Sequence, residues 1–375
     1  MISSLSRLKR RLQFTGWLQY IPTAVLGLAF GLAAGLAGLL GAPRAAYPFG
    51  LIGILLLAVL VFDLVTVKYN LRPRERLPQR NDGLGIFDLM RARRSCRSFQ
   101  DRKLTPADHS ELMKSVRLHS QEPRIGKLPI RFEYVSAPLT VWPVVGASEF
   151  LIAIAPIEYN RLAVIDVGRT LQKIVMDATR MGLGTCWIGP GADHASIMRH
   201  LGERFNPQQD HIICICALGY KSAFWPLFLR FVQFQFHRRR PLSSLFYADA
   251  TFQAPLDVGA YPFNRFGRCY EVCQWSPSSY NGQTTRCAVG MERNGEAGEN
   301  ILRLARFDFY AATPSRYYAP VAVGIWCADW EMGCEALGIR GHFAVLSSVE
   351  RGLQDGQDRP LLPRYDVSWV LDEKV

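Results

Sequence analysis

The sequence Arg93-Arg94-Ser95-Cys96-Arg97-Ser98-Phe99 lies just ahead of a predicted helix, and the interpretation of the chain depends on it. Three arginines and a serine fall within five residues of one short segment. Guanidinium groups and a hydroxyl in this arrangement suit a phosphate or another planar anion. Clustered arginines are also common on solvated surfaces, so the motif gains its meaning from the rest of the chain.

The residues after this motif predict a mixed α and β domain. Thr105-Pro106-Ala107-Asp108 is typical of a helix start, which predicts a helix over about 106–118. Apolar patterns predict strands over 131–137, 150–157 and 185–188, and a strand that ends near Gly219 and Tyr220. Between them, a helical stripe runs from Val167 to Met181, and a short helix is predicted over about 195–202.

The N-terminal region is apolar although the chain is basic. The 375 residues carry a formal charge of +12, yet 49% are hydrophobic. The stretches from Phe14 to Pro43 and from Ala45 to Phe62 contain no charge apart from Arg44 between them, and about 20 residues suffice to span a bilayer. The apolar core of a signal peptide is about 7–15 residues long, which is too short for this pattern. We therefore predict a membrane anchor over residues 1–67, with transmembrane helices over about 16–41 and 46–67.

The distribution of charge predicts the orientation of this anchor. Cations precede the first span and follow the second, whereas the turn between the spans has only Arg44. The positive-inside rule then predicts a two-pass protein of the cell (inner) membrane, with its catalytic domain in the cytoplasm. Gly27, Gly31 and Gly35 share one helix face, which favours close packing of the two spans or oligomerisation through that face.

Cysteine usage and basicity exclude several classes of protein. Nine cysteines in a cytoplasmic domain are expected to stay reduced, and no CxxC pair with a neighbouring histidine cluster indicates a metal site. The basic residues gather beside the membrane spans and the arginine motif, and no nucleic-acid motif is present, so we expect no nucleic-acid partner.

The remaining segments define the predicted domain organisation. Residues 68–84 are charged and contain proline, which indicates a linker, and residues 85–240 and 241–375 form two halves. The aromatic segment from Phe224 to Phe236 precedes His237-Arg238-Arg239-Arg240-Pro241. We favour a hydrophobic strap over the domain, because the helical pattern of this segment is poor. The alternative is an interfacial anchor on anionic lipid.

The two halves repeat one pattern. Val323, Cys327, Trp330, Cys334 and Leu337 reproduce the stripe of the first half, and a strand-like segment, 341–346, follows. Val323 and Val167, Gly324 and Gly168, and Gly338 and Gly182 are each separated by 156 residues. This constant offset predicts an internal duplication into two similar half-domains.

The halves differ where a site is expected. The second half carries a turn rich in hydroxyls and amides, 276–286, whereas the equivalent stretch 120–124 lacks them. Conversely, only the first half has the arginine cluster. If the halves pack as a two-fold pseudo-dimer, the two components meet across the interface, and only one of the two resulting sites is complete.

The arginine motif, the turn Pro277-Ser278-Ser279-Tyr280-Asn281-Gly282-Gln283 and the segment 182–189 together resemble the flavin-dependent nitroreductase superfamily, in particular its fused members. The resemblance covers roughly residues 85–350. It implies an α+β nitroreductase-like fold built as an intramolecular pseudo-dimer. It also implies FMN between the halves and ping-pong electron transfer from NAD(P)H to an acceptor.

The resemblance also implies roles for individual residues. Arg93, Arg94 and Ser95 would hold the FMN phosphate, with Arg238 and Arg240 as a second basic pair. Arg97 would face the N1/O2 edge of the flavin ring, and the backbone near Ile188 and Gly189 would contact its N5 and O4. The ring would be lined from the other half by Pro277, Ser278, Ser279 and Asn281, with Gln283 behind them. No catalytic protein side chain is required, because the flavin carries the chemistry.

These features favour a membrane-anchored FMN oxidoreductase that reduces a nitroaromatic, a quinone or a similar conjugated small molecule. Two alternatives stay open at this point. One is a specialised flavin reaction such as reductive dehalogenation. The other is a non-catalytic scaffold, with or without flavin, that uses the lipid bilayer as its partner. The sequence does not distinguish NADH from NADPH.

Overall fold

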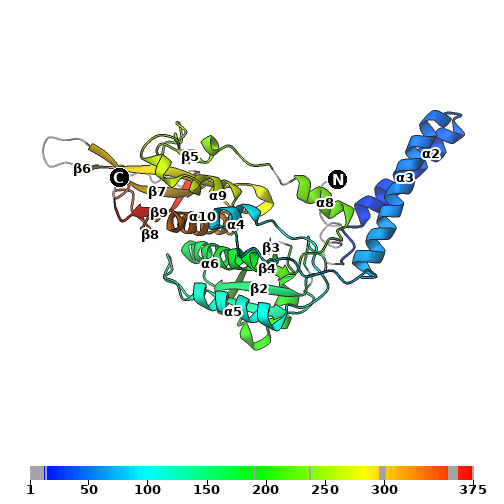
Figure 1. Ribbon diagram of the computed structural model, residues 1–375, viewed down its shortest axis with the longest axis horizontal. Helices are drawn as coiled ribbons and strands as arrows, with labels where there is room; N and C mark the ends of the chain where they lie inside the picture. Colours follow the sequence, from blue (N-terminus) through cyan, green and yellow to red (C-terminus); the bar gives the residue numbers. More distant parts are fainter. Residues whose placement is uncertain are drawn as a thin grey trace.

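The computed structural model describes residues 12, 15–139, 141–189, 191–235, 238–294, 301–353 and 362–373. It consists of a body with two β-sheets and a helical hairpin that projects away from that body (Figure 1). The α+β class predicted from the sequence is confirmed.

The first half of the body is built on a four-stranded antiparallel sheet in the order β1-β2-β4-β3. Its elements are α4 (Ile86–Ala92), α5 (Pro106–Ser120), β1 (Arg131–Ser136), β2 (Glu149–Pro156), α6 (Arg161–Arg180), β3 (Gly184–Ile188), α7 (His194–Leu201), the 3₁₀ turn Gly202–Arg204 and β4 (Asp210–Gly219). The predicted helix start is confirmed: Thr105 Oγ1 accepts a hydrogen bond from the Asp108 backbone N–H at 3.2 Å. The four predicted strands and the two further predicted helices are also present.

The second half is built on a five-stranded sheet in the order β5-β6-β7-β9-β8, in which only β5 is parallel to its neighbour. Its elements are the 3₁₀ turn Leu242–Ser244, β5 (Phe246–Tyr247), the 3₁₀ turn Phe263–Phe266, α9 (Cys269–Trp275), the 3₁₀ turn Ser279–Asn281, β6 (Thr285–Asn294), β7 (Ile301–Ala311), α10 (Tyr318–Ala336), β8 (Gly341–Ala344) and β9 (Arg364–Leu371). Apart from β5, the strands follow the same order in both sheets when β1, β2, β3 and β4 are matched with β6, β7, β8 and β9.

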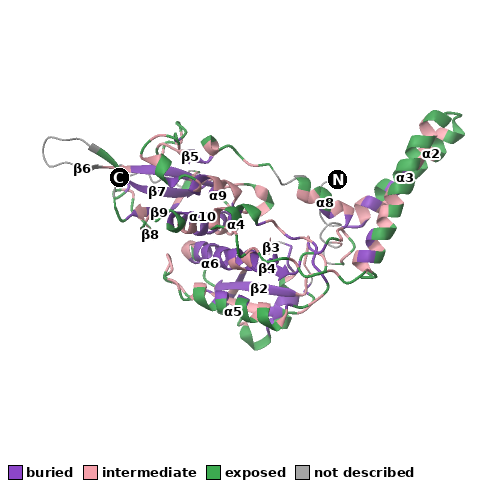
Figure 2. Ribbon diagram, viewed as in Figure 1, coloured by how far each residue is buried: buried purple, intermediate pink, exposed green. Residues whose placement is uncertain are grey.

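Helices α6 and α10 form the layer between the two sheets (Figure 1), and both are almost entirely buried (Figure 2). They touch closely at two glycines. A Cβ on Gly168 would lie 2.4 Å from the Val321 carbonyl oxygen, and one on Gly324 would lie 2.0 Å from that of Ile165. Any side chain at either position would force the helices apart. Gly168 and Gly324 are also one of the residue pairs that defined the 156-residue offset.

The hairpin consists of α2 (Ile21–Leu39) and α3 (Pro43–Asp63), which continues as a π-helix, Leu64–Lys68. Both helices are long and apolar enough to cross a membrane, and most of their side chains are exposed (Figure 2). A Cβ on Gly53 of α3 would lie 3.0 Å from the Gly31 backbone nitrogen and 3.1 Å from the Gly27 carbonyl oxygen. Two of the three glycines on the predicted packing face therefore contact the neighbouring span of the same chain. Self-association through that face stays a prediction, as do the domain limits.

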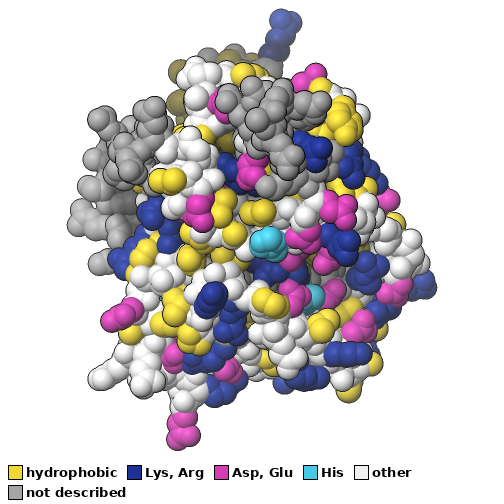
Figure 3. Space-filling model, turned by 90° about the vertical axis from the view of Figure 1, so that its left-hand side faces the viewer, with side chains coloured by type: hydrophobic (Ala, Val, Ile, Leu, Met, Phe, Trp, Pro, Cys, Tyr) yellow, Lys and Arg dark blue, Asp and Glu magenta, His cyan; other side chains and the backbone are white. Residues whose placement is uncertain are grey.

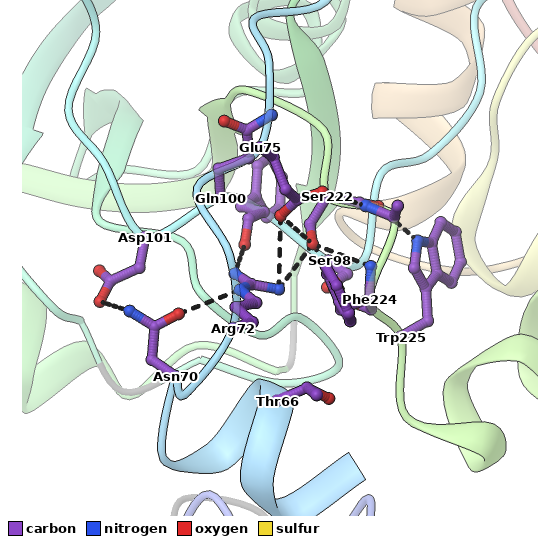
Figure 4. A network of polar contacts seen from close by, with 12 residues as sticks. Thr66, Asn70, Arg72, Glu75, Ser98, Gln100, Asp101, Ser222, Phe224 and Trp225 are labelled. Atoms are coloured by element: carbon purple, nitrogen blue, oxygen red, sulfur yellow. Dashed lines mark hydrogen bonds and ion pairs between the residues drawn. The ribbon is translucent and has the colours of Figure 1, made fainter. Parts of the chain in front are cut away.

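The segment predicted as a linker lies firmly against the body (Figure 4). Arg72 donates hydrogen bonds to Ser222 Oγ at 2.7 Å and to the Phe99 carbonyl at 3.2 Å. The Glu75 carboxylate accepts from the Ala223 backbone N–H at 2.6 Å. Charged residues of the predicted linker therefore form anchoring contacts, which connect the hairpin to the segment around the arginine motif.

The aromatic segment differs from its preferred interpretation as a strap. Residues Leu227–Gln235 form helix α8, which contacts both α2 and α3, whereas Phe236 and His237 lie outside the described residues. The Asp63 carboxylate accepts from the Leu227 backbone N–H at 2.7 Å and so caps the first turn of α8. The pattern of one segment could not reveal this helix, because a residue from α3 stabilises its start.

Candidate functional site

A cavity of about 410 Å³ lies between the two halves, a size typical of small-molecule and cofactor sites. Most of the residues predicted to bind a cofactor line it. From the first half these are Arg93, Arg94, Ser95, Arg97, Ile188 and Gly189, and from the second half Pro277, Ser278, Ser279 and Asn281. The tertiary structure therefore brings together two motifs that are about 180 residues apart in the chain.

The arginine motif is held as extended backbone beside strand β3. The Cys96 backbone N–H donates to the Thr185 carbonyl at 2.8 Å, and the Val145 N–H donates to the Arg97 carbonyl at 2.9 Å. Successive side chains of an extended segment point in opposite directions. Cys96 and Ser98 are accordingly buried in the body, whereas Ser95 and Arg97 line the cavity.

The cationic side chains at the cavity lack acidic partners. Within the described residues, Arg93, Arg94, Arg97 and Arg239 form no ion pair with a carboxylate, and Arg93 Nη1, Arg97 Nε and Arg239 Nε are buried without a hydrogen-bond partner. Arg93 is only 5% exposed. Buried donors without partners are rare because they forgo the hydrogen bonds that water would supply. The cluster is therefore suited to an anionic ligand.

The electrostatics of these arginines support the same conclusion. Burial, followed by repulsion from Arg93 and Arg94, lowers the pKa of Arg239 to about 10. Burial also lowers the pKa of Arg93, although the charge of Asp329 acts in the opposite direction. Asp329 is buried, and burial raises its own pKa to about 6. A phosphate group in the cavity would offset both the free-energy cost of burying these cations and their mutual repulsion.

The turn from the second half has an unusual backbone. Tyr280, Asn281 and Gln283 have φ angles of 51°, 52° and 47°, in the left-handed region that residues other than glycine seldom adopt. The Ser278 hydroxyl stabilises this conformation by accepting a hydrogen bond from the Gln283 backbone N–H at 2.9 Å. Several left-handed residues in one turn are a feature of functional sites, where the surrounding structure enforces the strain.

Three of the predicted cofactor residues, Arg238, Arg240 and Gln283, do not line the cavity. Arg238 and Arg240 are exposed, and Arg239 between them reaches the cavity. The Asn281 side chain accepts from Arg239 Nη1 at 2.6 Å and donates to the Arg238 carbonyl at 2.8 Å. Gln283 accepts from the Arg240 backbone N–H at 2.8 Å. The resemblance assigned a cofactor role to Arg238 and Arg240, whereas Arg239 lines the cavity. A run of three arginines does not by itself indicate which of them points inward.

The structure also adds cavity residues that the sequence analysis did not assign. They are Trp142, Pro143, Gly191, Ile213, Val232, Gln233, Tyr317, Tyr318, Val321, Ala322 and Ile325, and Trp187 of the predicted segment 182–189 also lines the cavity. Val232 and Gln233 belong to α8, and Tyr317 precedes the first turn of α10. No local pattern of residues 224–236 placed α8 at the cavity.

The thiol in the motif is not a reactive one. Cys96 is buried, and burial, assisted by the nearby Cys186, raises its pKa to about 12. The thiolate is the nucleophilic form of cysteine, so this side chain serves as packing. All nine cysteines are buried and free.

A second crevice between the halves has the opposite character. We call the five residues His119, Glu122, Arg169, Lys173 and Glu331 the paired crevice. Arg169 donates to both Glu331 carboxylate oxygens, at 2.9 and 2.6 Å, and Lys173 Nζ lies 2.5 Å from Glu122 and 2.8 Å from Glu331. The face of the molecule opposite the hairpin likewise carries acidic and basic side chains intermixed (Figure 3).

Comparison with known proteins identifies relatives of this chain. A family model described as "Putative TM nitroreductase" matches residues 85–296, more than half of the chain. No curated protein matches the chain.

Several solved structures are similar to it at low sequence identity. One described as a "putative nitroreductase" from Thermotoga maritima is 16% identical with a TM-score of 0.45, over 80% of this chain and 100% of that one. An FMN-dependent nitroreductase from Clostridium difficile R20291 is 20% identical with a TM-score of 0.30, over 36% and 86%. A nitroreductase with bound FMN from Bacteroides fragilis is 15% identical with a TM-score of 0.29, over 37% and 89%.

Proposed function

The chain belongs to this nitroreductase family, and we propose that it is a membrane-anchored, FMN-dependent oxidoreductase. It takes electrons from NAD(P)H and passes them to a nitroaromatic, a quinone or a similar conjugated small molecule. The observation that carries this proposal is the cavity between the halves, where three buried arginine nitrogen atoms, Arg93 Nη1, Arg97 Nε and Arg239 Nε, have no hydrogen-bond partner among the described residues.

The residues at the cavity fit FMN. Arg93, Arg94, Ser95 and Arg239 form a cationic group that would hold the phosphate, and Arg97 lies on the same extended segment to face the ring. The apolar and aromatic side chains of Trp187, Tyr317, Tyr318 and Ile325 give the cavity walls suited to a flat ring. When bound, the flavin supplies the hydride chemistry. The protein binds and orients it, excludes water, and places a positive charge where negative charge develops.

The exposed apolar surface of the hairpin supports the proposed membrane anchor. Leu28, Leu32 and Leu36 of α2 are largely exposed, and nothing in the described structure covers them. An apolar hairpin of this length is stable in a bilayer, where its backbone hydrogen bonds are satisfied within each helix. We propose that it lies in the cell (inner) membrane with both ends in the cytoplasm, because cations flank the two spans on that side.

The pseudo-dimer is also part of the proposal. The common strand order of the two sheets, the contact of α6 with α10 at Gly168 and Gly324, and the 156-residue offset support descent of the halves from one duplicated unit. In this arrangement one composite site is complete, and its counterpart is the paired crevice.

The experiment is an absorbance spectrum of the detergent-purified full-length protein, with the released flavin counted per chain. We expect about one FMN per chain, reduced by NADH or NADPH, and lost in Arg94→Ala or Arg97→Ala. Two FMN per chain would show that both sites are complete. No flavin, even after incubation with excess FMN, would leave the non-catalytic scaffold as the function.

A further inference from the structure

Helix α8 joins the cavity to the apolar hairpin. Its residues Val232 and Gln233 line the cavity, and the helix also contacts α2 and α3. It lies beside the end of the hairpin nearest the body (Figure 1). One short helix is therefore a wall of the site and a neighbour of the proposed membrane spans at the same time.

The outward side of α8 is apolar and exposed. Leu229 is completely buried, whereas Phe231 is 57% exposed and Phe234 is 73% exposed. Phe231 and Phe234 are three residues apart and so share one helix face. Exposed phenylalanines beside a membrane span, with the exposed Arg230 next to them, are typical of a helix that lies in the membrane interface.

The position of α8 relative to the spans is fixed. Asp63 at the end of α3 caps its first turn, and the Ser98 hydroxyl of the arginine motif donates to the Phe224 carbonyl at 2.5 Å, just before the helix. Arg72 and Glu75 bind the segment after α3 to residues 222 and 223 (Figure 4). A simple tether would be a flexible linker without such contacts, whereas this connection is hydrogen-bonded to the body at several points.

From this geometry we infer that α8 is the membrane-facing mouth of the cavity, and that the site receives a long-tailed quinone dissolved in the bilayer. This inference rests on the proposed function. The apolar tail stays among the lipids beside Phe231 and Phe234, and the aromatic head group passes α8 into the cavity.

The overall reaction balances with NAD(P)H, the electron donor already proposed. NAD(P)H gives up two electrons and one proton as hydride, water supplies the second proton, and the quinone becomes a hydroquinone. The hydroquinone then returns to the bilayer by the same route.

The test uses full-length protein saturated with FMN in phospholipid vesicles. Two acceptors with the same quinone head group are compared, one with a long isoprenoid tail in the bilayer and one without a tail in the water. The variant is Phe231→Ser/Phe234→Ser. The control is Leu118→Ser, which changes a similarly exposed residue (59%) of α5.

We expect the double variant to reduce the long-tailed quinone at least tenfold more slowly, with its rate toward the tail-less quinone and its flavin content unchanged. An unchanged rate toward the long-tailed quinone, or an equal loss with both acceptors, would overturn the membrane route and leave the proposed function intact. Failure of the wild-type protein to bind FMN, or of the bound FMN to accept electrons from NADH or NADPH, would overturn the proposed function itself.

A second measurement tests the position of α8 without depending on activity. All nine native cysteines are buried, so Phe234→Cys offers one accessible thiol for an environment-sensitive fluorophore. We expect a blue-shifted emission in vesicles compared with Leu118→Cys. An emission at position 234 that matches the water-exposed control would overturn the inference.

Discussion

The two crevices between the halves both contain buried cations, but only one of them pairs these cations with carboxylates. At the cavity, Arg93 and Arg239 have buried nitrogen atoms without partners, and no carboxylate pairs with them among the described residues. In the paired crevice, Arg169 and Lys173 share the carboxylates of Glu122 and Glu331. Buried charge requires compensation. The charges of the paired crevice therefore compensate one another and stabilise the fold. The arginines of the cavity lack this compensation, and a bound anion would supply it.

The residue numbers of the paired crevice connect this contrast with the predicted duplication. Glu122 and Pro123 are 156 residues before Ser278 and Ser279, the hydroxyl residues of the cavity turn. If the halves descend from a duplicated unit, the paired crevice is where the second site would lie. In that case an ion network would occupy the place of the second binding site.

The largest effect is expected where the paired network is broken. Glu331→Gln should lower the free energy of unfolding by about 3–5 kcal/mol, because Arg169 and Lys173 are mostly buried and lose their shared carboxylate. Chemical denaturation of the apoprotein measures this. The control Glu335→Gln, an exposed position on the same helix, should change stability by about 0.5 kcal/mol or less. Equal stability of the two variants would contradict the structural role of the network.

The second prediction concerns the pH dependence of the paired crevice. Burial lowers the pKa of His119, but hydrogen bonds to Asp177 and Glu122 outweigh burial and raise it to about 9. A raised histidine pKa stabilises the fold fully below the unfolded value of about 6.5, and this contribution is lost as pH rises to 9. The wild type should lose at most about 3 kcal/mol of stability between these pH values.

His119→Gln should lack this pH-dependent contribution to stability. The variant should be less stable than the wild type at pH 6.5, and the two should converge near pH 9. Denaturation curves at several pH values test this. A constant difference between the two proteins across the range would show that protonation of His119 is not involved.

The third prediction is a matched pair of arginine substitutions. Arg93→Met should weaken FMN binding roughly ten- to hundredfold, since a charge-assisted hydrogen bond contributes about 1.5–3 kcal/mol. It should destabilise the apoprotein little, because the buried charge it removes forms no ion pair among the described residues. Arg169→Met should do the reverse, with lower stability and unchanged flavin affinity. Flavin titration and chemical denaturation of both variants test this prediction. Equal losses of flavin affinity and of stability in the two variants would refute it.

The smallest effect is expected behind the cavity. Gln283→Ala removes the side chain that holds the 238–240 backbone, so Arg239 should become less ordered and FMN affinity should fall about fivefold, or about 1 kcal/mol. In an Arg239→Ala background the same substitution should have little further effect, because its role is to position Arg239. A fully additive double variant would show that Gln283 acts independently of that arginine.

Local patterns predicted a large part of this molecule. The helix that starts after Thr105, the strands of the first half, the stripes of α6 and α10 and the apolar hairpin all follow from spacing and composition. Ten of the thirteen residues to which the family resemblance assigned a cofactor role line one cavity.

The remaining features are decided by contacts between distant segments. The sequence by itself determined which side chains can bind an anion and where the apolar helices lie, since charge, hydrogen-bonding groups and periodicity are local properties. Only the tertiary structure decided that Arg239 rather than its neighbours reaches the cavity, that Asp63 starts α8, and that α8 joins the cavity to the hairpin. The physical reason is that the hydrogen bonds accepted by Asn281, Gln283 and Asp63 join residues 42 to 164 positions apart in the chain, a separation that no local pattern records.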